Sequence, residues 1–182
     1  MELPASIIEK CRKGDNKAQQ ILYQYYSPTM YGVCLRYFPN AEIAKDILQD
    51  GFVKIFNSIQ NFRFEGSIEG WIRRIIVNTA LEFHRKSKKE EKEVDICEAI
   101  AIEGSEPTID VDYKQLLTLI AELPNQYRLV FNLYAIEGYS HSEIGEMIGI
   151  SESTSKSNYS RAKAILREKL INIRKIDKYA FL

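Results

Sequence analysis

The most informative residues of this chain are 149–166, GISESTSKSNYSRAKAIL. Between Ser151 and Ser160, nine of the ten residues are polar and five are serine, a composition that a flexible linker could also have. The apolar residues that follow recur at helical spacing, and they are Ala162, Ile165, Leu166 and Leu170. The pattern predicts a long final helix that is capped by Ser151, small and polar in its first turns and apolar and basic in its last.

A second helix is predicted just before this one. The residues YSHSEI, 139–144, fit a capping box, in which Ser140 accepts from the amide of Glu143 and the Glu143 carboxylate accepts from the amide of Ser140. This helix should end near Ile148, with Gly149 in the turn. Two helices joined by a short turn with glycine have the spacing of a helix-turn-helix. In that motif the N-terminal end of the second helix enters the DNA major groove.

The start of the final helix therefore carries our candidate contacts to duplex DNA. Small hydroxyl side chains allow close approach and donate to phosphate oxygens, and cations add attraction. The candidates are Ser153, Thr154, Lys156, Ser157, Ser160 and Arg161. The alternative is a solvated helix start with no partner. Serine is a mediocre helix former, however, and five serines in ten residues suit a merely structural helix poorly.

The composition is that of a folded globular protein, with 45% of the 182 residues hydrophobic and 27% charged. This length allows one or two small domains. No apolar run approaches the roughly 20 residues that span a bilayer. The first residues, MELPASIIEKCRKGD, lack the basic and apolar segments of a secretory signal. We expect a cytoplasmic protein with no membrane insertion.

Residues that hold metals or perform catalysis are scarce. The three cysteines are far apart, no CxxC pair exists, and the only histidines are His84 and His141. A zinc site or a disulfide framework is therefore not expected. Neither a Ser/His/Asp set nor a phosphate-binding glycine loop is visible, so an enzyme is the least favoured class. We expect no metal and no other cofactor.

The charges are unevenly distributed although the net charge is zero. Residues 73–89 carry six Lys/Arg against one acid, residues 90–112 nine acids against one base, and residues 152–175 seven Lys/Arg against two acids. Two basic blocks are thus separated by an acidic one, which we interpret as a linker between two helical domains. The predicted divisions are a domain over 1–90, a linker over 91–110, a domain over 111–176 and a tail over 177–182.

Strand signals are nearly absent, so the predicted fold is all-α. In the first half, helices are expected over 3–13, from 15 to 38 with a break or restart at Pro28, over 41–59, and from 68 to about 87. The last of these should bury Trp71 and expose a face that holds Arg74, Asn78 and Arg85.

The loop before that helix, NFRFEGS, adds Phe62, Arg63 and Phe64. Arginine with aromatics suits a single nucleic-acid strand, because bases stack on rings and phosphates pair with cations. Burial of Phe62 and Phe64 in the core would explain the two rings equally well. Trp71 fits a core position better than a base platform.

The order of these features resembles the bacterial RNA polymerase sigma factors, specifically the compact two-domain extracytoplasmic-function group. Four stretches carry the resemblance: GDNKAQQILYQYYSPTMYGVCLRYF (14–38), DILQDGF (46–52), GWIRRIIVNTALEFHRK (70–86), and the segment from ELPNQYR to AILREKL (122–170). Together they cover nearly the whole chain in order. The combination is far more specific than any one stretch.

The resemblance implies core RNA polymerase and promoter DNA as partners, together with an anti-sigma factor. The docking residues it implies for polymerase are Asp46, Gln49, Asp50 and Asn57. A base of the minus-ten element would be extruded into a pocket formed by the 62–67 loop. The residues implied for this element are Phe62, Arg63, Phe64, Ser67, Arg74, Asn78 and Arg85. The second domain would read the minus-thirty-five duplex through the six side chains named above. The acidic linker would thread the polymerase channel, although a plain tether explains its charge equally well.

Three residues depart from the family pattern. Val77 stands where many relatives have a basic residue, which we expect to weaken the charge of the minus-ten face. Ser155 stands where many have valine, so the final helix should lack an apolar anchor or staple partner there. Glu82 replaces a commoner aspartate.

Two other classes of protein would explain part of the sequence. A stand-alone helix-turn-helix regulator would explain residues 110–175 but not the acidic stretch 46–51. A helical anti-sigma or scaffold protein would have no DNA affinity, which the two basic blocks oppose.

Overall fold

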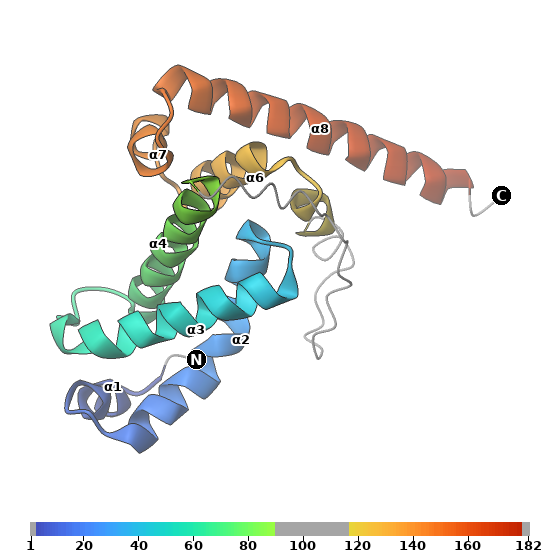
Figure 1. Cartoon of the computed structure of the whole chain (residues 1–182). Helices are drawn as coiled ribbons and strands as arrows, with labels where there is room; N and C mark the ends of the chain where they lie inside the picture. The colour runs from blue at the N-terminus through green and yellow to red at the C-terminus, as the bar shows by residue number, and fades with distance from the viewer. Residues whose placement is uncertain (1–2, 90–116, 180–182) are drawn as a thin grey trace. The chain divides into compact units, whose positions relative to one another are not determined.

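The computed structural model describes residues 3–89 and 117–179, and every regular element in these two ranges is a helix. The all-α prediction is therefore confirmed. The chain divides into two compact units, one within residues 1–95 and one within 96–182 (Figure 1). The predicted acidic linker, 91–110, lies outside the described residues, so its path stays a prediction. None of the described helices is long and apolar enough to cross a membrane.

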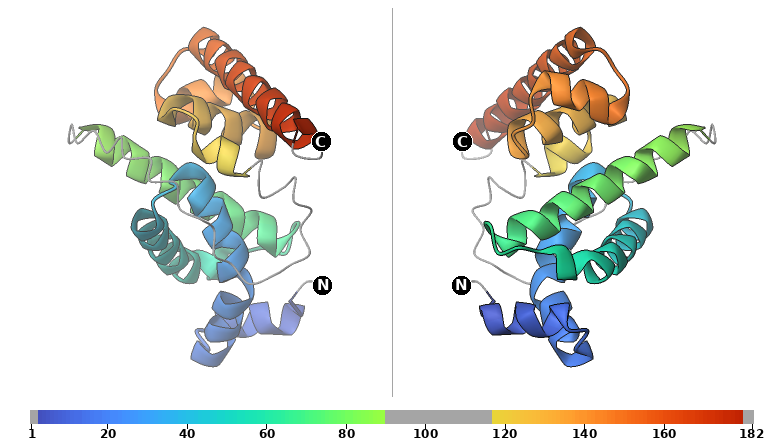
Figure 2. Two further views of the ribbon diagram at one scale, coloured as in Figure 1. Left: turned by 90° about the vertical axis from the view of Figure 1, so that its right-hand side faces the viewer. Right: turned by 90° about the vertical axis from the view of Figure 1, so that its left-hand side faces the viewer.

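The N-terminal unit is built from four α-helices and one short 3-10 turn. They are α1 (Ala5–Arg12), α2 (Asn16–Tyr37), α3 (Ala41–Ser58), η1 (Ile59–Asn61) and α4 (Ile68–Lys89). Figure 2 shows from two sides how α2, α3 and α4 pack on one another, with α1 beside α2. Leu22, Ile47 and Ile72 are almost fully buried between them. A Cβ at Gly51 would meet Ile76 Cδ1, so α3 and α4 approach closely at this glycine.

The helix starts of this unit follow from capping. Asp15 accepts a hydrogen bond from the amide of Ala18 at 3.0 Å, and Asn40 accepts from the amides of Glu42 and Ile43. The predicted break at Pro28 is wrong, because α2 runs through this residue without interruption. Pro28 is exposed, so water can solvate the carbonyl that proline leaves without a donor, and the helix continues.

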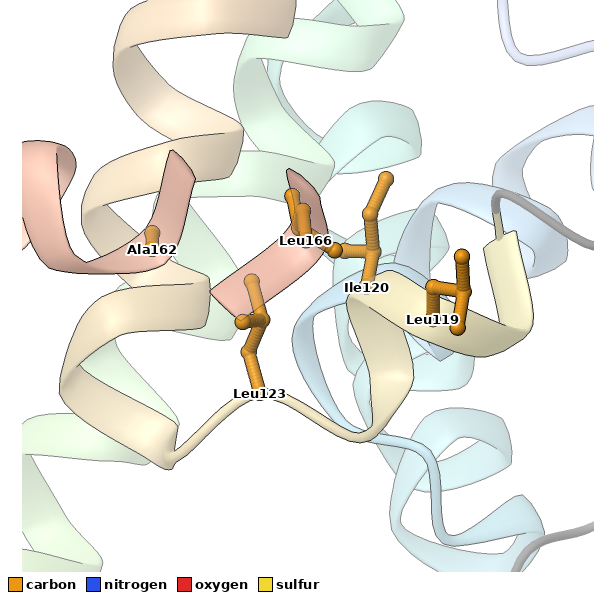
Figure 3. Close-up of a cluster of buried hydrophobic side chains, with 5 residues drawn as sticks. All are labelled: Leu119, Ile120, Leu123, Ala162 and Leu166. Atoms are coloured by element: carbon orange, nitrogen blue, oxygen red, sulfur yellow. The ribbon is translucent and has the colours of Figure 1, made fainter. Parts of the chain in front are cut away.

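The C-terminal unit begins, within the described residues, with a helical segment over 117–121. The elements that follow are α6 (Asn125–Phe131), a π turn η2 (Asn132–Ile136), α7 (His141–Ile148) and α8 (Glu152–Tyr179). A cluster of buried apolar side chains joins the first segment to α8 (Figure 3). Its members are Leu119, Ile120, Leu123, Ala162 and Leu166. The helix α8 continues to Tyr179, so it extends into the predicted tail over 177–182.

The helix-turn-helix has the local chemistry that its sequence predicts. The capping box is present: the Ser140 amide donates to Glu143 Oε2 at 2.8 Å, and the Glu143 amide donates to Ser140 Oγ at 3.2 Å. Gly149 turns the chain with φ 70°, a left-handed conformation that favours glycine. Ser151 caps α8 by accepting from the amide of Thr154 at 3.0 Å. A Cβ at Gly145 would lie 2.7 Å from the carbonyl oxygen of Ile150, so the turn passes directly over this glycine.

Candidate DNA-binding and docking surfaces

The first turns of α8 present one open polar face. The side chains spaced three and four residues apart along this face are exposed, and they are Ser153, Lys156, Ser157, Ser160 and Arg161. Thr154, the sixth predicted contact, is half-buried. Arg161 donates to the Tyr127 hydroxyl at 3.2 Å, which holds its guanidinium beside α6. The structure therefore brings five of the six predicted residues onto a single accessible surface.

Lys156 pairs with Glu152 one turn earlier, at 2.6 Å between Nζ and Oε1. The hydrogen bond from Lys156, and then its charge, lower the pKa of the Glu152 carboxyl. Glu152 is the acidic residue in the first turn of α8. A phosphate that approaches this end of the helix would compete with Glu152 for the Lys156 ammonium.

The opposite face of α8 is anchored by a polar residue. Ser155 is fully buried, and its Oγ lies 2.9 Å from Nδ1 of His141 in α7. An apolar anchor is absent at this position, as expected, and a hydrogen bond between the two helices takes its place. The His141 ring also stacks on Tyr134, with ring centroids 4.1 Å apart. Burial, together with the nearby Lys156 charge, lowers the pKa of His141.

The helix α4 separates a buried stripe from an exposed one. Arg74, Asn78 and Arg85 are exposed, as predicted from their spacing. Glu82, on the same side, forms an ion pair with Lys54 of α3 at 2.6 Å.

Val77 is only 1% exposed and faces the core of the unit, so the expectation that it weakens the charge of this surface is wrong. It lies three, four and seven residues before Ala80, Leu81 and His84, which are also buried. Val77 therefore belongs to the buried stripe of α4 rather than to its exposed face.

The loop between η1 and α4 forms a hollow of about 350 Å³ with the start of α4. Its lining residues are Asn61, Phe62, Arg63, Glu65, Ser67, Gly70, Trp71 and Arg74. The predicted residues Arg63, Ser67 and Arg74 thus meet at one site. Phe62 lines it too but is only 5% exposed, so its ring is mainly part of the core.

Other predicted residues of the minus-ten set lie outside this hollow. Phe64 packs against Phe62, with ring centroids 5.1 Å apart, and is not part of the lining. Asn78 and Arg85 lie further along α4, on its exposed face.

Sequence reasoning missed four members of the hollow, which are Asn61, Glu65, Gly70 and Trp71. Asn61 at the end of η1 and Glu65 in the loop each lie two residues from Arg63, and their polarity was the available signal. Trp71, which we expected to be core, is half-buried and forms part of the wall. With two arginines, one carboxylate, an amide, a hydroxyl and an aromatic wall, the hollow can both hydrogen-bond and stack on a flat polar ring.

A third surface lies on α3. The four residues predicted to dock on polymerase, Asp46, Gln49, Asp50 and Asn57, are all exposed. Ile47, Phe52 and Ile55 of the same helix are buried, so the polar stripe faces outward. Val53 is 54% exposed and falls within the stripe, seven residues after Asp46. An apolar residue at a helical spacing from two carboxylates was the signal that could have identified it as part of the same surface.

Comparison with known families agrees with this arrangement. Residues 22–90 match the family described as Sigma-70 region 2, and residues 113–166 match the one described as Sigma-70, region 4. The two matches together span about two thirds of the chain and fall on the two compact units. The chain belongs to the sigma-70 family of RNA polymerase sigma factors.

Relatives of the chain include sigma factors of the extracytoplasmic-function (ECF) group. The ECF RNA polymerase sigma-E factor of Haemophilus influenzae is 26% identical, over 91% of this chain and 94% of that protein. The sigma-E factor of Escherichia coli K12 is 25% identical, over 90% and 92%. The RNA polymerase sigma-H factor of Pseudomonas aeruginosa is also 25% identical, over 93% and 94%.

Two solved structures share the fold. One is the sigma factor RpoE in complex with the anti-sigma factor NepR from Bartonella quintana, with a TM-score of 0.55, 22% identity, and coverage of 83% of this chain and 95% of that one. The other is CnrH in complex with the cytosolic domain of CnrY, with a TM-score of 0.50, 18% identity, and coverage of 91% and 96%.

Proposed function

We propose that this chain is an ECF-type sigma factor that binds core RNA polymerase and directs it to specific promoters. The observation that carries this conclusion is the presence of regions 2 and 4 in one chain, in that order. Each region presents an exposed polar surface of the chemistry its task requires. Carboxylates on α3 suit a protein partner with basic groups, whereas hydroxyls and cations at the start of α8 suit DNA.

In this proposal the N-terminal unit docks through Asp46, Gln49, Asp50 and Asn57 of α3, with Val53 as the apolar contact among them. The hollow beside α4 receives one base of the separated minus-ten strand. Extruding a base costs a few kcal/mol, which stacking on Trp71 and hydrogen bonds to the loop offset. Farther along α4, Asn78 and Arg85 hold the strand, and Arg85 supplies charge for a phosphate.

The C-terminal unit reads the minus-thirty-five duplex through the face of α8 that carries Ser153, Lys156, Ser157, Ser160 and Arg161. Small hydroxyl side chains let the helix enter the major groove closely. Lys156 and Arg161 contact phosphates, so their contribution should depend on salt. The Ser155–His141 bond fixes the angle between α7 and α8, which aims this face.

The proposal extends to regulation and location. Proteins of this family are transcription initiation factors, and we infer that the chain has no catalytic activity of its own, since the chemistry belongs to the polymerase. The two solved structures described above are complexes, the first with an anti-sigma factor and the second with the cytosolic domain of CnrY. We therefore propose that an anti-sigma factor restrains this chain in the cytoplasm until an inducing signal arrives.

Gel filtration with sigma-free core RNA polymerase tests the proposal. We expect the purified chain to co-elute with the core, and the complex to start transcripts at DNA that it selects from a random promoter library. Failure to co-elute, with circular dichroism showing a folded protein, would favour the stand-alone helix-turn-helix regulator. That alternative predicts tight specific binding to duplex DNA without polymerase, which a filter-binding assay on the same library would detect.

A further inference from the structure

The loop that forms the hollow is tied to the first helix of the chain by one side chain. Arg12 is the last residue of α1. Its Nη2 donates a hydrogen bond to the backbone carbonyl of Gln60 in η1 at 3.1 Å. Its guanidinium carbon also lies 5.6 Å from the centre of the Phe64 ring, the geometry of a cation–π contact. Arg12 therefore holds the loop at two points, before and within it.

From Phe64 a series of aromatic contacts leads to the wall of the hollow. The rings of Phe64 and Phe62 have centroids 5.1 Å apart, and those of Phe62 and Trp71 are 5.6 Å apart. Trp71 belongs to α4 and lines the hollow, whereas Arg12 and Phe64 do not. A displacement of Phe64 is thus transmitted through Phe62 to a side chain that touches whatever occupies the site.

The backbone of Phe64 needs such support. Its φ is 58°, and it is the one non-glycine residue with a positive φ in the described ranges 3–89 and 117–179. A residue with a Cβ is unfavourable in this conformation and keeps it only when its surroundings enforce it. Phe64 is still 40% exposed, so the surrounding core alone does not enclose it.

A basic residue at a helix C-terminus has a simpler purpose, since it complements the helix dipole. Lys13, the next residue, carries the same charge at the same helix end and meets that purpose equally. The dipole therefore does not account for the two directed contacts that Arg12 makes with Gln60 and Phe64.

We propose that Arg12 is a positioning residue for the minus-ten hollow, which it keeps open for a base by holding the 62–67 loop through Phe64 and the Gln60 carbonyl. The proposal rests on the proposed function, because the base is assigned to the hollow there. Arg12 acts through the loop and does not itself contact the DNA.

The fluorescence of the free protein gives the first test. Trp71 is the only tryptophan of the chain, so its emission reports on the wall of the hollow without a label. We expect Arg12→Ala to raise the acrylamide quenching constant of Trp71 and to shift its emission to the red. Arg12→Lys, which keeps a cation and a donor, should restore most of the wild-type signal. Equal quenching in Arg12→Ala and the matched control Lys13→Ala would overturn the proposal. This test needs neither DNA nor polymerase, so its failure is distinct from failure of the proposed function.

The second test measures DNA binding by the complex with core polymerase. The probe is a fluorescein-labelled single strand that the wild-type complex selects from a random pool, with a scrambled strand as reference. We expect Arg12→Ala to bind the selected strand about fivefold more weakly, the size of one exposed cation–π contact. Affinity for core polymerase and for the scrambled strand should not change. An equal loss on both strands would make Arg12 a phosphate contact and refute its positioning role.

A double-mutant cycle tests the route through Phe64. If Arg12 acts by holding this ring, Arg12→Ala should add little to the loss already caused by Phe64→Ala. Fully additive losses would show that the two side chains act independently, and the proposed route would be wrong.

Discussion

Replacing Gly145 by alanine tests the geometry of the helix-turn-helix. The added Cβ would lie 2.7 Å from the Ile150 carbonyl oxygen and 3.6 Å from the Glu152 amide nitrogen. Both are backbone atoms, so no side-chain rotation relieves the clash, and α7 and α8 must move apart. Overpacking of this kind costs about 1–3 kcal/mol, whereas alanine regains up to about 1 kcal/mol of helix propensity. We expect a net loss of about 1–2 kcal/mol in the unfolding free energy of the C-terminal unit.

Thermal unfolding is the assay for this loss. For a unit of this size, about 1 kcal/mol corresponds to a shift of roughly 4–8 °C, so the midpoint should fall by about 10 °C. Circular dichroism follows both units, and Trp71 emission follows the N-terminal unit alone, whose midpoint should not change.

Gly32→Ala is the matched control, because Gly32 lies inside α2 with nothing within 4 Å of an added Cβ. It should stabilise its unit by up to about 1 kcal/mol. A Gly145→Ala variant as stable as wild type would show that the turn does not pass over this glycine.

Three further predictions concern single charged or titrating side chains. Asp50→Lys should abolish co-elution with core polymerase without changing the melting curve, and retained binding would place the docking surface elsewhere. Arg161→Ala should reduce the slope of log affinity against log salt by about 1, and an unchanged slope would place Arg161 away from phosphate. The pKa of His141 is lowered from 6.5 in the folded state, so below about pH 6.5 the unfolded chain binds a proton more readily than the folded one. The unfolding free energy should therefore be highest above about pH 6.5 and decrease as the pH drops below it. Urea titrations at several pH values should show this decline in wild type and less of it in His141→Gln.

Capping chemistry made most of the fold predictable. Several helices begin at a residue whose side chain accepts a hydrogen bond from an amide three residues further on. These capping residues are Asp15, Ser140 with its partner Glu143, and Ser151. Such signals are local, so the sequence reveals them. Pro28 misled the prediction because the effect of proline on a helix depends on whether its face is solvated, and that is a property of the packed unit.

The surfaces were predictable wherever helical periodicity applies. The exposed residues of α4 and of the start of α8 follow largely from helical spacing, whereas the docking residues of α3 were implied by the family resemblance. Val77 was misplaced because it was grouped with its neighbour Asn78 instead of with Ala80 and Leu81. The loop before α4 has no helical periodicity from which the exposure of its side chains could be predicted. The Phe64 ring contacts Arg12, which lies far away in the sequence, and no local rule predicts such a contact.

The hydrogen bond between buried Ser155 and half-buried His141 determines how this helix-turn-helix can be altered. A hydrogen bond has direction, so it fixes the rotation of α8 about its own axis as well as its distance from α7. A chimera that received a new α8 with valine at the position of Ser155 would leave His141 Nδ1 facing an apolar group. Residues 141 and 155 must therefore be exchanged together when promoter preference is transplanted into this chain.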